Sequence, residues 1–258
     1  MSQQDQIEVM NELTRAHEYI QDLERERDLR EQFVSILTHD LRTPLTAAKM
    51  AAQIIARRPE RIEKTKQLIE KVIGSIDRMD QMIRDLLDAN RIRVGEPLAM
   101  MMGECDLRNI ATDTLRELSM SFGDRFMLET DRESICGYWN AEGVRRVLEN
   151  LVNNAAKYGK PNELIKVILK QVDHEIQIIV HNLGNPISPE DLKCLFQPFC
   201  RTSTAQHGDK RGWGLGLTLV RGVAEAHGGK VSVESNEMDG TTFTVTLPRD
   251  ARPYQLLH

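Results

Sequence analysis

The sequence HDLRTP at residues 39–44 places a histidine beside an aspartate, a pairing that could carry out nucleophilic chemistry. A neutral imidazole is nucleophilic at pH 7, because its pKa is about 6.5. Asp40 could take the proton of His39 as a general base. His39 falls at the outermost position of a helical heptad, where another domain could reach it, and Pro44 should bend the helix. Taken alone, His39 is better explained as a solvated surface residue.

A second polar group, Asn150, Asn154 and Lys157, has spacings of four and three residues. This spacing places the three side chains on one face of a predicted helix. A carboxamide oxygen is a hard, neutral ligand that suits Mg²⁺, and the lysine would meet phosphate oxygens. In isolation, an ordinary polar helix face is the better explanation.

Two glycine-containing segments could bind a flat ligand and its phosphates. NLGNPI at 182–187 directly follows a predicted strand, and Gly184 allows close backbone approach. GWGLGL at 212–217 opens a predicted helix, where free N–H groups and the positive end of the helix dipole attract phosphate. The second segment has neither the Rossmann nor the Walker A spacing. Alone, the first is an ordinary strand-to-helix turn.

The elements that must position these residues fall into two parts. Residues 7–57 predict a helix with heptad apolar spacing, and residues 62–90 predict a second one after the break RRPE at 57–60. Together they form a helical hairpin, which has too little core to stand alone. Two copies would build a four-helix bundle, so we expect a homodimer through residues 7–90. Residues 1–38 carry the whole net charge, as an acidic solvated arm.

The second part alternates helices and strands. Helices are predicted at 107–121, 141–158 and near 215–227, and strands at 125–130, 134–139, 164–172, 175–181, 230–235 and 241–247. This order predicts an α/β sandwich with helices on one sheet face. The predicted fold class is therefore α plus α/β, with domains at 1–32, 33–95 and 104–250.

The composition limits the classes of function. The chain has 258 residues, with 34 basic and 39 acidic side chains and a net charge of −5. These counts exclude a strongly basic nucleic-acid binder, and we expect no nucleic-acid partner. Four cysteines without a CxxC pair are no disulfide scaffold and fit a reducing compartment. With no apolar run near 18 residues and no signal-peptide pattern, the chain is expected to be soluble and cytoplasmic. A longer protein containing it could be membrane-attached.

The order and spacing of the motifs resemble the cytoplasmic core of a sensor histidine kinase, over roughly residues 30–248. In that family's terms, residues 39–44 resemble the phospho-acceptor box, 150–158 the N box, 182–187 the first glycine box, 195–199 the F box and 212–217 the second glycine box. HGG at 227–229 and GTTF at 240–243 complete the pattern. The resemblance implies a dimeric four-helix bundle followed by an ATP-binding α/β sandwich of the Bergerat type.

The resemblance also implies a reaction. His39 would accept the γ-phosphoryl group of ATP, and Asp40 would be its acid/base neighbour. Thr43 lies where the family places a group that orients water during phosphatase action. The phosphoryl group would pass to an aspartate in the receiver domain of a response regulator. An upstream sensor domain, absent from this chain, would signal through the helix at 1–32, although a passive dimerisation coil explains that helix equally well.

The implied nucleotide site joins several boxes. Asn154, with Asn150, would hold Mg²⁺, while Lys157 and Tyr158 would contact ATP and a lid at 200–213 would close over the phosphates. The full set of implied ligand residues is Asn150, Asn154, Lys157, Tyr158, Asn182, Gly184, Gly212, Gly214, Leu215, Gly216 and Thr241.

One position departs from the family pattern. Asn182 stands where the family usually has an aspartate that accepts a hydrogen bond from the adenine amino group. An amide oxygen can still accept that bond, but the charge-assisted part is lost, which would weaken ATP binding by about 1–2 kcal/mol. We expect Asn182→Asp to tighten ATP binding.

Three alternatives to a histidine autokinase stay open at this point. One is a phosphatase-dominant member of the family, which Thr43 and Asn182 favour. Another is a coiled-coil scaffold that binds nucleotide without chemistry, which the presence of His39, Asp40 and Asn154 disfavours. The third is a gyrase- or chaperone-type ATPase of the same sandwich fold, which would lack the phospho-acceptor hairpin.

Overall fold

The computed structural model describes residues 15–17, 19–21, 34, 37–38, 40–56, 62–198, 200 and 214–255. They belong to two compact units, residues 1–82 and residues 83–258, and the division falls within the helix α2 (Ile62–Arg93). Most of the predicted arm, His39, Gly212 and residues 201–213 lie outside the described residues. No described helix is both long enough and apolar enough to cross a membrane.

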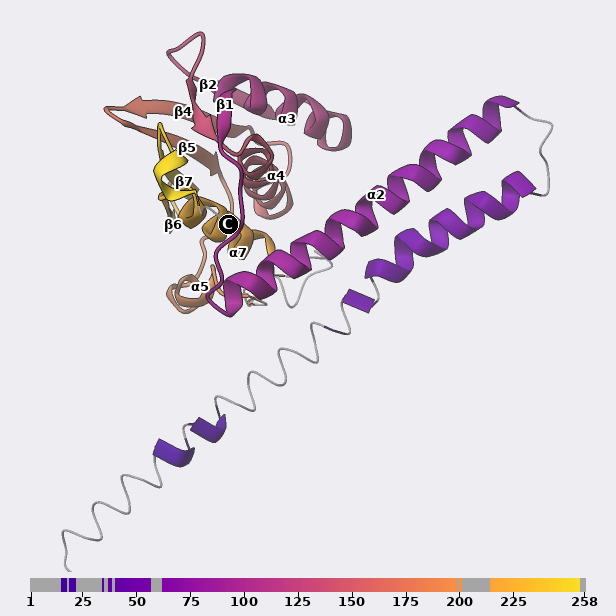
Figure 1. The fold of residues 1–258 in the computed structure, drawn as a ribbon, viewed down its shortest axis with the longest axis horizontal. Coiled ribbons are helices and arrows are strands. Elements are labelled where there is room, and N and C mark those ends of the chain that lie inside the picture. Colours follow the sequence, from indigo (N-terminus) through magenta and orange to yellow (C-terminus); the bar gives the residue numbers. More distant parts are fainter. Residues whose placement is uncertain are drawn as a thin grey trace, which may run out of the picture. The chain divides into compact units, whose positions relative to one another are not determined.

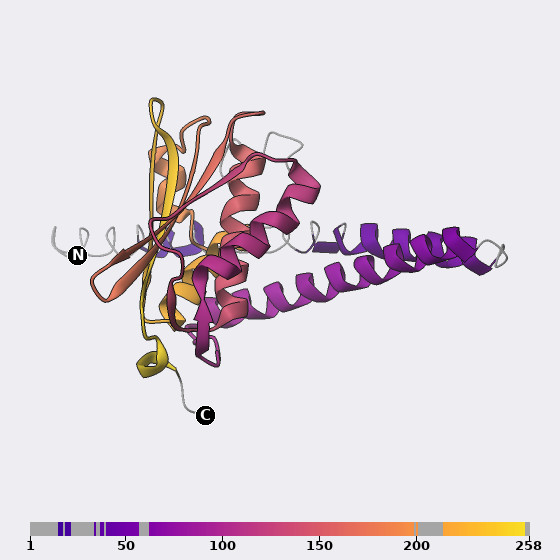
Figure 2. The ribbon, with the colours of Figure 1, turned by 90° about the horizontal axis from the view of Figure 1, so that it is seen from above.

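The first unit contains two helical segments that run side by side (Figures 1 and 2). Residues 40–56 are helical throughout, including Pro44, and the small side chains of Ala48 and Ala51 are buried. The second segment is the first part of α2. Both predicted helices of the hairpin are therefore confirmed over these residues, and the predicted turn at 57–60 lies outside the described part.

The apolar residues that recur along α2 with heptad spacing form a stripe, and the rest of the chain buries this stripe only in part. Ile69, Ile76 and Ile83 have exposures of 46%, 51% and 47%. Toward its end, the helix becomes part of the second unit, where Ala89 is fully buried. The stripe therefore leaves apolar surface along much of the helix.

The second unit is built on a five-stranded sheet with the order β2-β4-β5-β7-β6. These strands are β2 (Phe126–Glu129), β4 (Ile165–Val172), β5 (Glu175–Asn182), β6 (Lys230–Asn236) and β7 (Gly240–Pro248). β2 pairs parallel with β4, and the other neighbours pair antiparallel. A separate ribbon joins β1 (Gly103–Asp106) to β3 (Cys136–Trp139).

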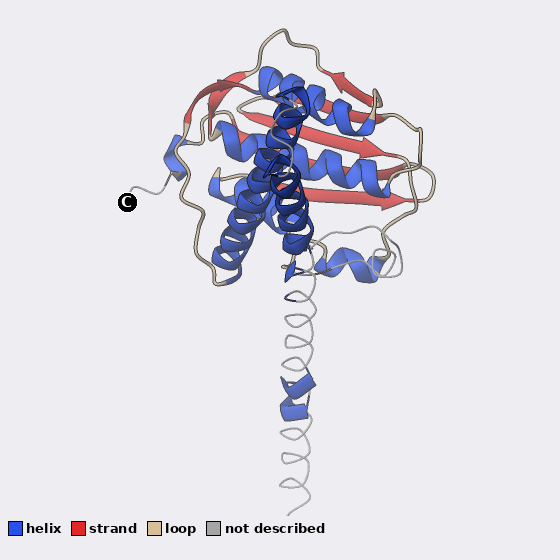
Figure 3. Ribbon diagram, turned by 90° about the vertical axis from the view of Figure 1, so that its right-hand side faces the viewer, coloured by secondary structure: helices blue, strands red, loops and turns tan. Residues whose placement is uncertain are grey.

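Three helices pack side by side on one face of this sheet: α3 (Leu107–Phe122), α4 (Ala141–Tyr158) and α7 (Gly216–Ala226) (Figures 2 and 3). The described part of this unit also contains two short helices, α5 (Pro189–Cys194) and the 3₁₀ helix η1 (Arg252–Tyr254). The predicted α/β sandwich with helices on one face is confirmed.

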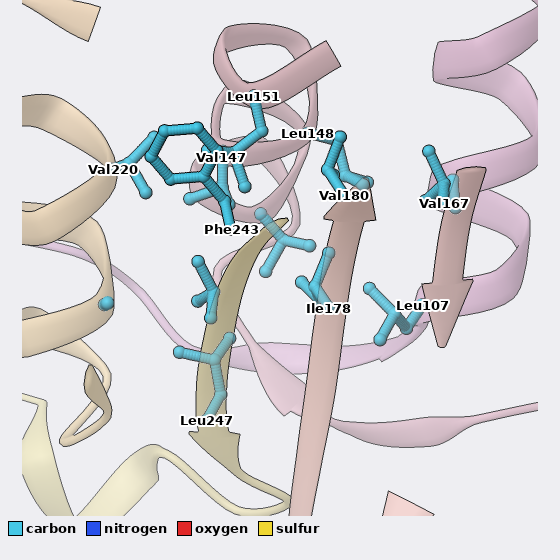
Figure 4. Packing of buried hydrophobic residues seen from close by; sticks show 14 of the residues in the cluster. Leu107, Val147, Leu148, Leu151, Val167, Ile178, Val180, Val220, Phe243 and Leu247 are labelled. Atoms are coloured by element: carbon cyan, nitrogen blue, oxygen red, sulfur yellow. The ribbon is translucent and has the colours of Figure 1, made fainter. Parts of the chain in front are cut away.

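The core lies between α4 and the central strands (Figure 4). In α4, Val144, Val147, Leu148 and Leu151 recur at helical spacing and are fully or almost fully buried. In β5, alternate residues beginning at Ile176 point to the same core. This packing fixes the end of α4 beside the end of β5, where the predicted ligand residues lie.

The structure contains a disulfide that the sequence did not indicate. Cys194, the last residue of α5, is bonded to Cys200, while Cys105 and Cys136 are free thiols. The two bonded residues are six positions apart. No CxxC pattern marks such a pair, so only the turn after α5 reveals it.

Candidate functional site

Asn182 closes β5 with its carboxamide held in one orientation. The residue is only 6% exposed, and its Nδ2 donates to the carbonyl oxygen of Leu183 at 3.2 Å. Because a carbonyl oxygen can only accept, the NH₂ group must face Leu183 and Oδ1 must point the other way. Asn182 therefore presents an acceptor, as recognition of an amino group requires.

Two glycines bring the end of α4 against the loop that follows Asn182. Gly159 and Gly184 form an antiparallel bridge, and the N–H of Lys160 donates to Leu183 O at 2.7 Å. A Cβ on Gly184 would lie 3.0 Å from the carbonyl oxygen of Tyr158. The predicted ligand residues Gly184 and Tyr158 are therefore brought together, although they are distant in sequence.

Thr241 lies beside Asn182 on the neighbouring strand. The two residues are partners in the β5–β7 register, and Thr241 is buried. Its Oγ1 lies 2.7 Å from Oγ of Ser235, which also accepts from the N–H of Ile187 at 3.0 Å. This chain of hydrogen bonds ties the loop after Gly184 to β6 and β7, so Thr241 supports the loop.

Asn150 in α4 faces the beginning of α7. Its Nδ2 donates to the carbonyl oxygen of Arg146 at 2.8 Å, which turns Oδ1 away from that carbonyl. A Cβ on Gly216 would lie only 2.5 Å from this Oδ1. The predicted metal ligand and the predicted phosphate loop are therefore direct neighbours.

Among the residues that the structure describes, no side chain caps the first turn of α7. Asn140, Asp106 and Ser188 cap α4, α3 and α5, but Leu215 makes no such hydrogen bond at the start of α7. Gly214 precedes it with φ +67°, a conformation that favours glycine. Uncapped N–H groups and the positive end of the helix dipole form a site that suits a phosphate.

The other residues predicted on α4 continue the same face. Asn154 is half-buried, while Lys157 and Tyr158 are exposed at the end of the helix. Because Asn150, Asn154 and Lys157 are spaced by four and three residues, their side chains share one face of α4, and that helix ends where Gly159 bridges Gly184. The carboxamide oxygens of Asn150 and Asn154 suit a metal ion, and the ammonium group of Lys157 suits the phosphates that such an ion would bind.

Asp40 and Thr43 belong to the first unit. Asp40 is half-buried and Thr43 is exposed, within the helical residues 40–56. His39 and Gly212, the remaining predicted site residues, lie outside the described residues. The described site residues from Asn150 to Thr241 all belong to the second unit.

Two glycines of the site were not among the predicted ligand residues, although Gly240 opens the GTTF motif at 240–243. Gly159 ends α4, where a Cβ would lie 2.5 Å from the carbonyl oxygen of Ala155. Gly240 begins β7 with φ +76°, and its Cα faces the backbone oxygen of Asn182 too closely for a side chain. A glycine directly after a predicted helix, or directly before a predicted strand, was the available signal.

Comparison with known proteins gives two domain matches. Residues 29–95 match the family described as His Kinase A (phospho-acceptor) domain. Residues 139–251 match the family described as histidine kinase-, DNA gyrase B-, and HSP90-like ATPase. The first range contains His39, Asp40 and Thr43, and the second contains every other predicted site residue.

Several proteins similar to this chain are named as histidine kinases. The chain is 31% identical over 221 residues to sensor histidine kinase CusS of Escherichia coli O157:H7, covering 84% of this chain and 45% of CusS. It is 28% identical over 243 residues to sensor-like histidine kinase SenX3 of Mycobacterium tuberculosis H37Rv, covering 91% and 59%. The catalytic domain of histidine kinase ThkA is 28% identical with a TM-score of 0.51, covering 59% of this chain and 98% of that domain. The chain thus spans about half the length of these curated relatives.

Proposed function

The chain belongs to the sensor histidine kinases, and from this premise we propose that it phosphorylates His39 from ATP and passes the phosphoryl group to a response regulator. The observation that carries the proposal is the close approach of Asn150 to the start of α7, where a Cβ on Gly216 would lie 2.5 Å from Asn150 Oδ1 and Leu215 provides no side-chain cap. It places a candidate metal ligand beside a candidate phosphate site.

The nucleotide would lie between α4, the end of β5 and the start of α7. Asn182 Oδ1 would accept a hydrogen bond from the adenine amino group, since Leu183 holds the amide in that orientation. The first-turn N–H groups of α7 would meet phosphate oxygens, and Lys157 would add a positive charge. Thr241 and Gly184 would shape the base end of the site.

The oxygen atoms present fit a magnesium ion. Asn150 Oδ1 is oriented by the bond from Nδ2 to Arg146 O, and Asn154 lies one helical turn further along α4. Carboxamide and phosphate oxygens are the hard ligands that Mg²⁺ prefers. When bound, Mg²⁺ would neutralise charge on the phosphate oxygens. This chain would hold the ion through Asn150 and Asn154.

The reaction itself needs a nucleophile and a proton acceptor. An imidazole nitrogen of His39 would form a bond to the γ-phosphorus while the bond from that phosphorus to the bridging oxygen of ADP breaks. Asp40 would take the proton that the imidazole loses. Transfer would continue to an aspartate of a receiver domain. ATP and such a partner place this chemistry in the cytoplasm.

The partly exposed stripe of α2 supports a homodimer. Ile69, Ile76 and Ile83 each stay about half exposed in one chain, and apolar burial stabilises by about 25 cal/mol per Å². A second copy would cover the stripe in a four-helix bundle. We expect Ile76→Glu to yield monomers in light scattering, whereas Met238→Glu, at a 90% exposed position of the second unit, should leave the dimer intact.

The experiment that tests the proposed activity is incorporation of γ-labelled phosphate from Mg-ATP. Wild type should gain label that acid removes and base does not, because a phosphorus–nitrogen bond hydrolyses in acid. His39→Ala should lose the label, whereas His174→Ala, at an exposed histidine of the second unit, should keep it. Label that persists in His39→Ala, or that survives acid, would contradict the proposal.

A further inference from the structure

Cys194 and Cys200 form a cross-link that the proposed kinase reaction does not use. Their Cα atoms are 6.0 Å apart, inside the range that a disulfide requires. Both residues are half-buried, so a small oxidant or reductant can reach them. Neither belongs to the ligand set built around Asn150 and Asn182.

We propose that Cys194 and Cys200 are a reversible thiol–disulfide site whose oxidation by a hydroperoxide slows the kinase. The proposal rests on the proposed function for its effect on phosphorylation, while formation of the cross-link is independent of that function. In reducing compartments, disulfides are usually transient and serve redox sensing or catalysis. A single pair beside a nucleotide site fits the sensing role.

The reduced state is also accommodated. When Cys194 is a thiol, its Sγ can donate to the carbonyl oxygen of Asp191 at 3.6 Å, one turn back in α5. The beginning of that short helix is capped independently, because Ser188 Oγ accepts from the N–H of Asp191 at 3.1 Å. Opening the cross-link therefore leaves α5 with its cap and gives Cys194 a partner.

The segment enclosed by the cross-link touches the start of α7. Phe196 lies within it, and the carbonyl oxygen of Phe196 accepts from Thr218 Oγ1 at 3.3 Å. The ring of Phe196 packs edge-on against Phe243 of β7, with centroids 6.4 Å apart. Thr218 belongs to the first turn of α7, two residues after Gly216. The redox pair is thus linked through Phe196 to the turn proposed to bind phosphate.

This linkage gives the direction of the effect. A cross-link between Cys194 and Cys200 removes conformations from the segment that includes Phe196. Phosphoryl transfer requires the elements around a nucleotide to adjust between binding and reaction. We therefore expect the oxidised protein to react more slowly and the reduced protein to react faster.

The redox step balances with a hydroperoxide as oxidant. One thiolate attacks the peroxide oxygen, forming a sulfenic acid and releasing hydroxide. The second thiolate then attacks that sulfur, forming the S–S bond and expelling the sulfenic oxygen as hydroxide, and the two protons released by the thiols convert both hydroxides to water. In total, two thiols and H₂O₂ give one disulfide and two waters, so two electrons pass to the peroxide. A dithiol reverses the step by exchange through a mixed disulfide.

The chain offers a matched control in its other two cysteines. Cys105 lies in β1 and Cys136 in β3, and both are free. Burial raises the pKa of the Cys105 thiol, which reduces its reactivity as a thiolate. The variant with Cys105→Ser and Cys136→Ser keeps only the proposed pair. Adding Cys194→Ser or Cys200→Ser to that background removes it.

The first measurement maps the cross-link in the full chain. Cleavage after Lys193 and Arg201 releases one peptide, residues 194–201, that contains both sulfurs. After treatment with H₂O₂, we expect this peptide to lose the mass of two hydrogens and to resist alkylation. Treatment with dithiothreitol should restore two alkylation sites. Two reactive thiols after peroxide treatment would overturn the proposal.

The second measurement compares initial rates of His39 labelling in the oxidised and reduced protein. We expect oxidation to decrease the labelling rate at least fivefold and dithiothreitol to restore it. The Cys105→Ser/Cys136→Ser variant should show the same decrease. The decrease should be absent when Cys194 or Cys200 is also replaced. A mapped cross-link with an unchanged rate would overturn the proposal. If the reduced protein takes no label at all, the proposed function fails. The redox inference is then decided by the Kd for Mg-ATP, which should differ at least threefold between the two states.

Discussion

Asn150 in α4 leaves no room for a side chain on Gly216 at the start of α7. A Cβ at position 216 would lie 2.5 Å from Asn150 Oδ1, well inside van der Waals contact. Asn150 cannot yield without cost, because its Nδ2 is bonded to Arg146 O at 2.8 Å. The glycine therefore sets the distance between a predicted metal ligand and the first N–H groups of α7.

We expect Gly216→Ala to weaken Mg-ATP binding at least tenfold, which corresponds to about 1.4 kcal/mol. The added methyl group must push either Asn150 or the first turn of α7 out of place. Calorimetric titration with Mg-ATP measures the loss. Gly103→Ala is the matched control, because nothing lies within 4 Å of its added Cβ. Equal affinities in the two variants would show that the contact does not shape the site.

Asn182→Asp should strengthen ATP binding but lower the stability of the fold. The carboxylate restores a charged acceptor for the adenine amino group, so we still expect tighter ATP binding by about 1–2 kcal/mol. The same substitution should destabilise the fold, because the carboxylate cannot donate to Leu183 O and one of its oxygens would face that carbonyl oxygen. We expect the free energy of unfolding to fall by about 1–3 kcal/mol at pH 7.

The pH dependence of Asn182→Asp checks this account. A carboxyl group buried beside a carbonyl oxygen has its pKa raised, so the protonated form, which can donate to Leu183 O, predominates in acid. The stability deficit should therefore be small in acid and appear as the pH rises through the folded pKa. Urea unfolding and ATP titration at two pH values measure both effects. Unchanged ATP affinity would refute the idea that the missing charge weakens binding.

The sequence predicted the elements that carry strong local signals. The bounds of α4, Ala141–Tyr158, were predicted without error, because Asn140 is a favoured cap and Gly159 a favoured stop. By contrast, β1 and α5 were missed, since four and six residues are too few to show a period. The disulfide was missed with α5, because the turn after it sets the separation of Cys194 and Cys200.

The candidate site was predicted as a set of residues but not as an arrangement. The motifs identified Asn150 and Gly216, yet nothing local in the sequence shows that they touch. The pairing of Asn182 with Thr241 likewise depends on the sheet order, which places β7 beside β5 although they are distant along the chain. The orientation of the Asn182 amide depends on one backbone carbonyl. Such relations arise from tertiary packing, which residue patterns do not encode.

His227 should make the stability of the second unit depend on pH. The residue is fully buried at the end of α7, with Nδ1 donating to Val223 O at 2.7 Å and Nε2 accepting from the N–H of Asn140 at 3.0 Å. A second proton on the ring would bind Nε2, which would then point its own N–H at the N–H of Asn140. Burial lowers the pKa of His227 below 6.5, and the bond to Val223 only partly offsets this.

Because the folded pKa is depressed, the unfolded chain binds this proton first as the pH falls. The contribution of His227 is thus complete above about pH 6.5 and is lost in acid, by up to about 1.4 kcal/mol per pH unit. Urea unfolding at about pH 7.5 and 5.5 measures the loss. His174→Gln, at an exposed site, should retain the full drop, whereas His227→Gln should reduce it. An undiminished drop in His227→Gln would assign the pH dependence to other groups.

Arg145 and Arg146 are adjacent in α4 and each binds two carboxylates, but in different surroundings. The Arg146 side chain is 12% exposed and lies 2.9 Å from Asp85 and 2.7 Å from Asp88, at the end of α2. The Arg145 side chain is 42% exposed and contacts Glu117 and Glu149 at similar distances. Burial opposes the charge of Arg146, but the hydrogen bond to Asp88 and the charges of both aspartates outweigh it and raise its pKa.

Arg146→Ala should lower the free energy of unfolding by about 3 kcal/mol, because two partly buried carboxylates lose their shared cation. Arg145→Ala should cost less than about 1 kcal/mol, since water screens its exposed pairs. Denaturant unfolding of the full chain measures both variants, and about 1 M NaCl should reduce only the Arg145 effect appreciably. Equal losses in the two variants would mean that burial does not distinguish these neighbouring arginines. Apolar packing, such as that of Ile92 against Gly222 of α7, and not the ion pairs to α4, would then hold the end of α2 in the second unit.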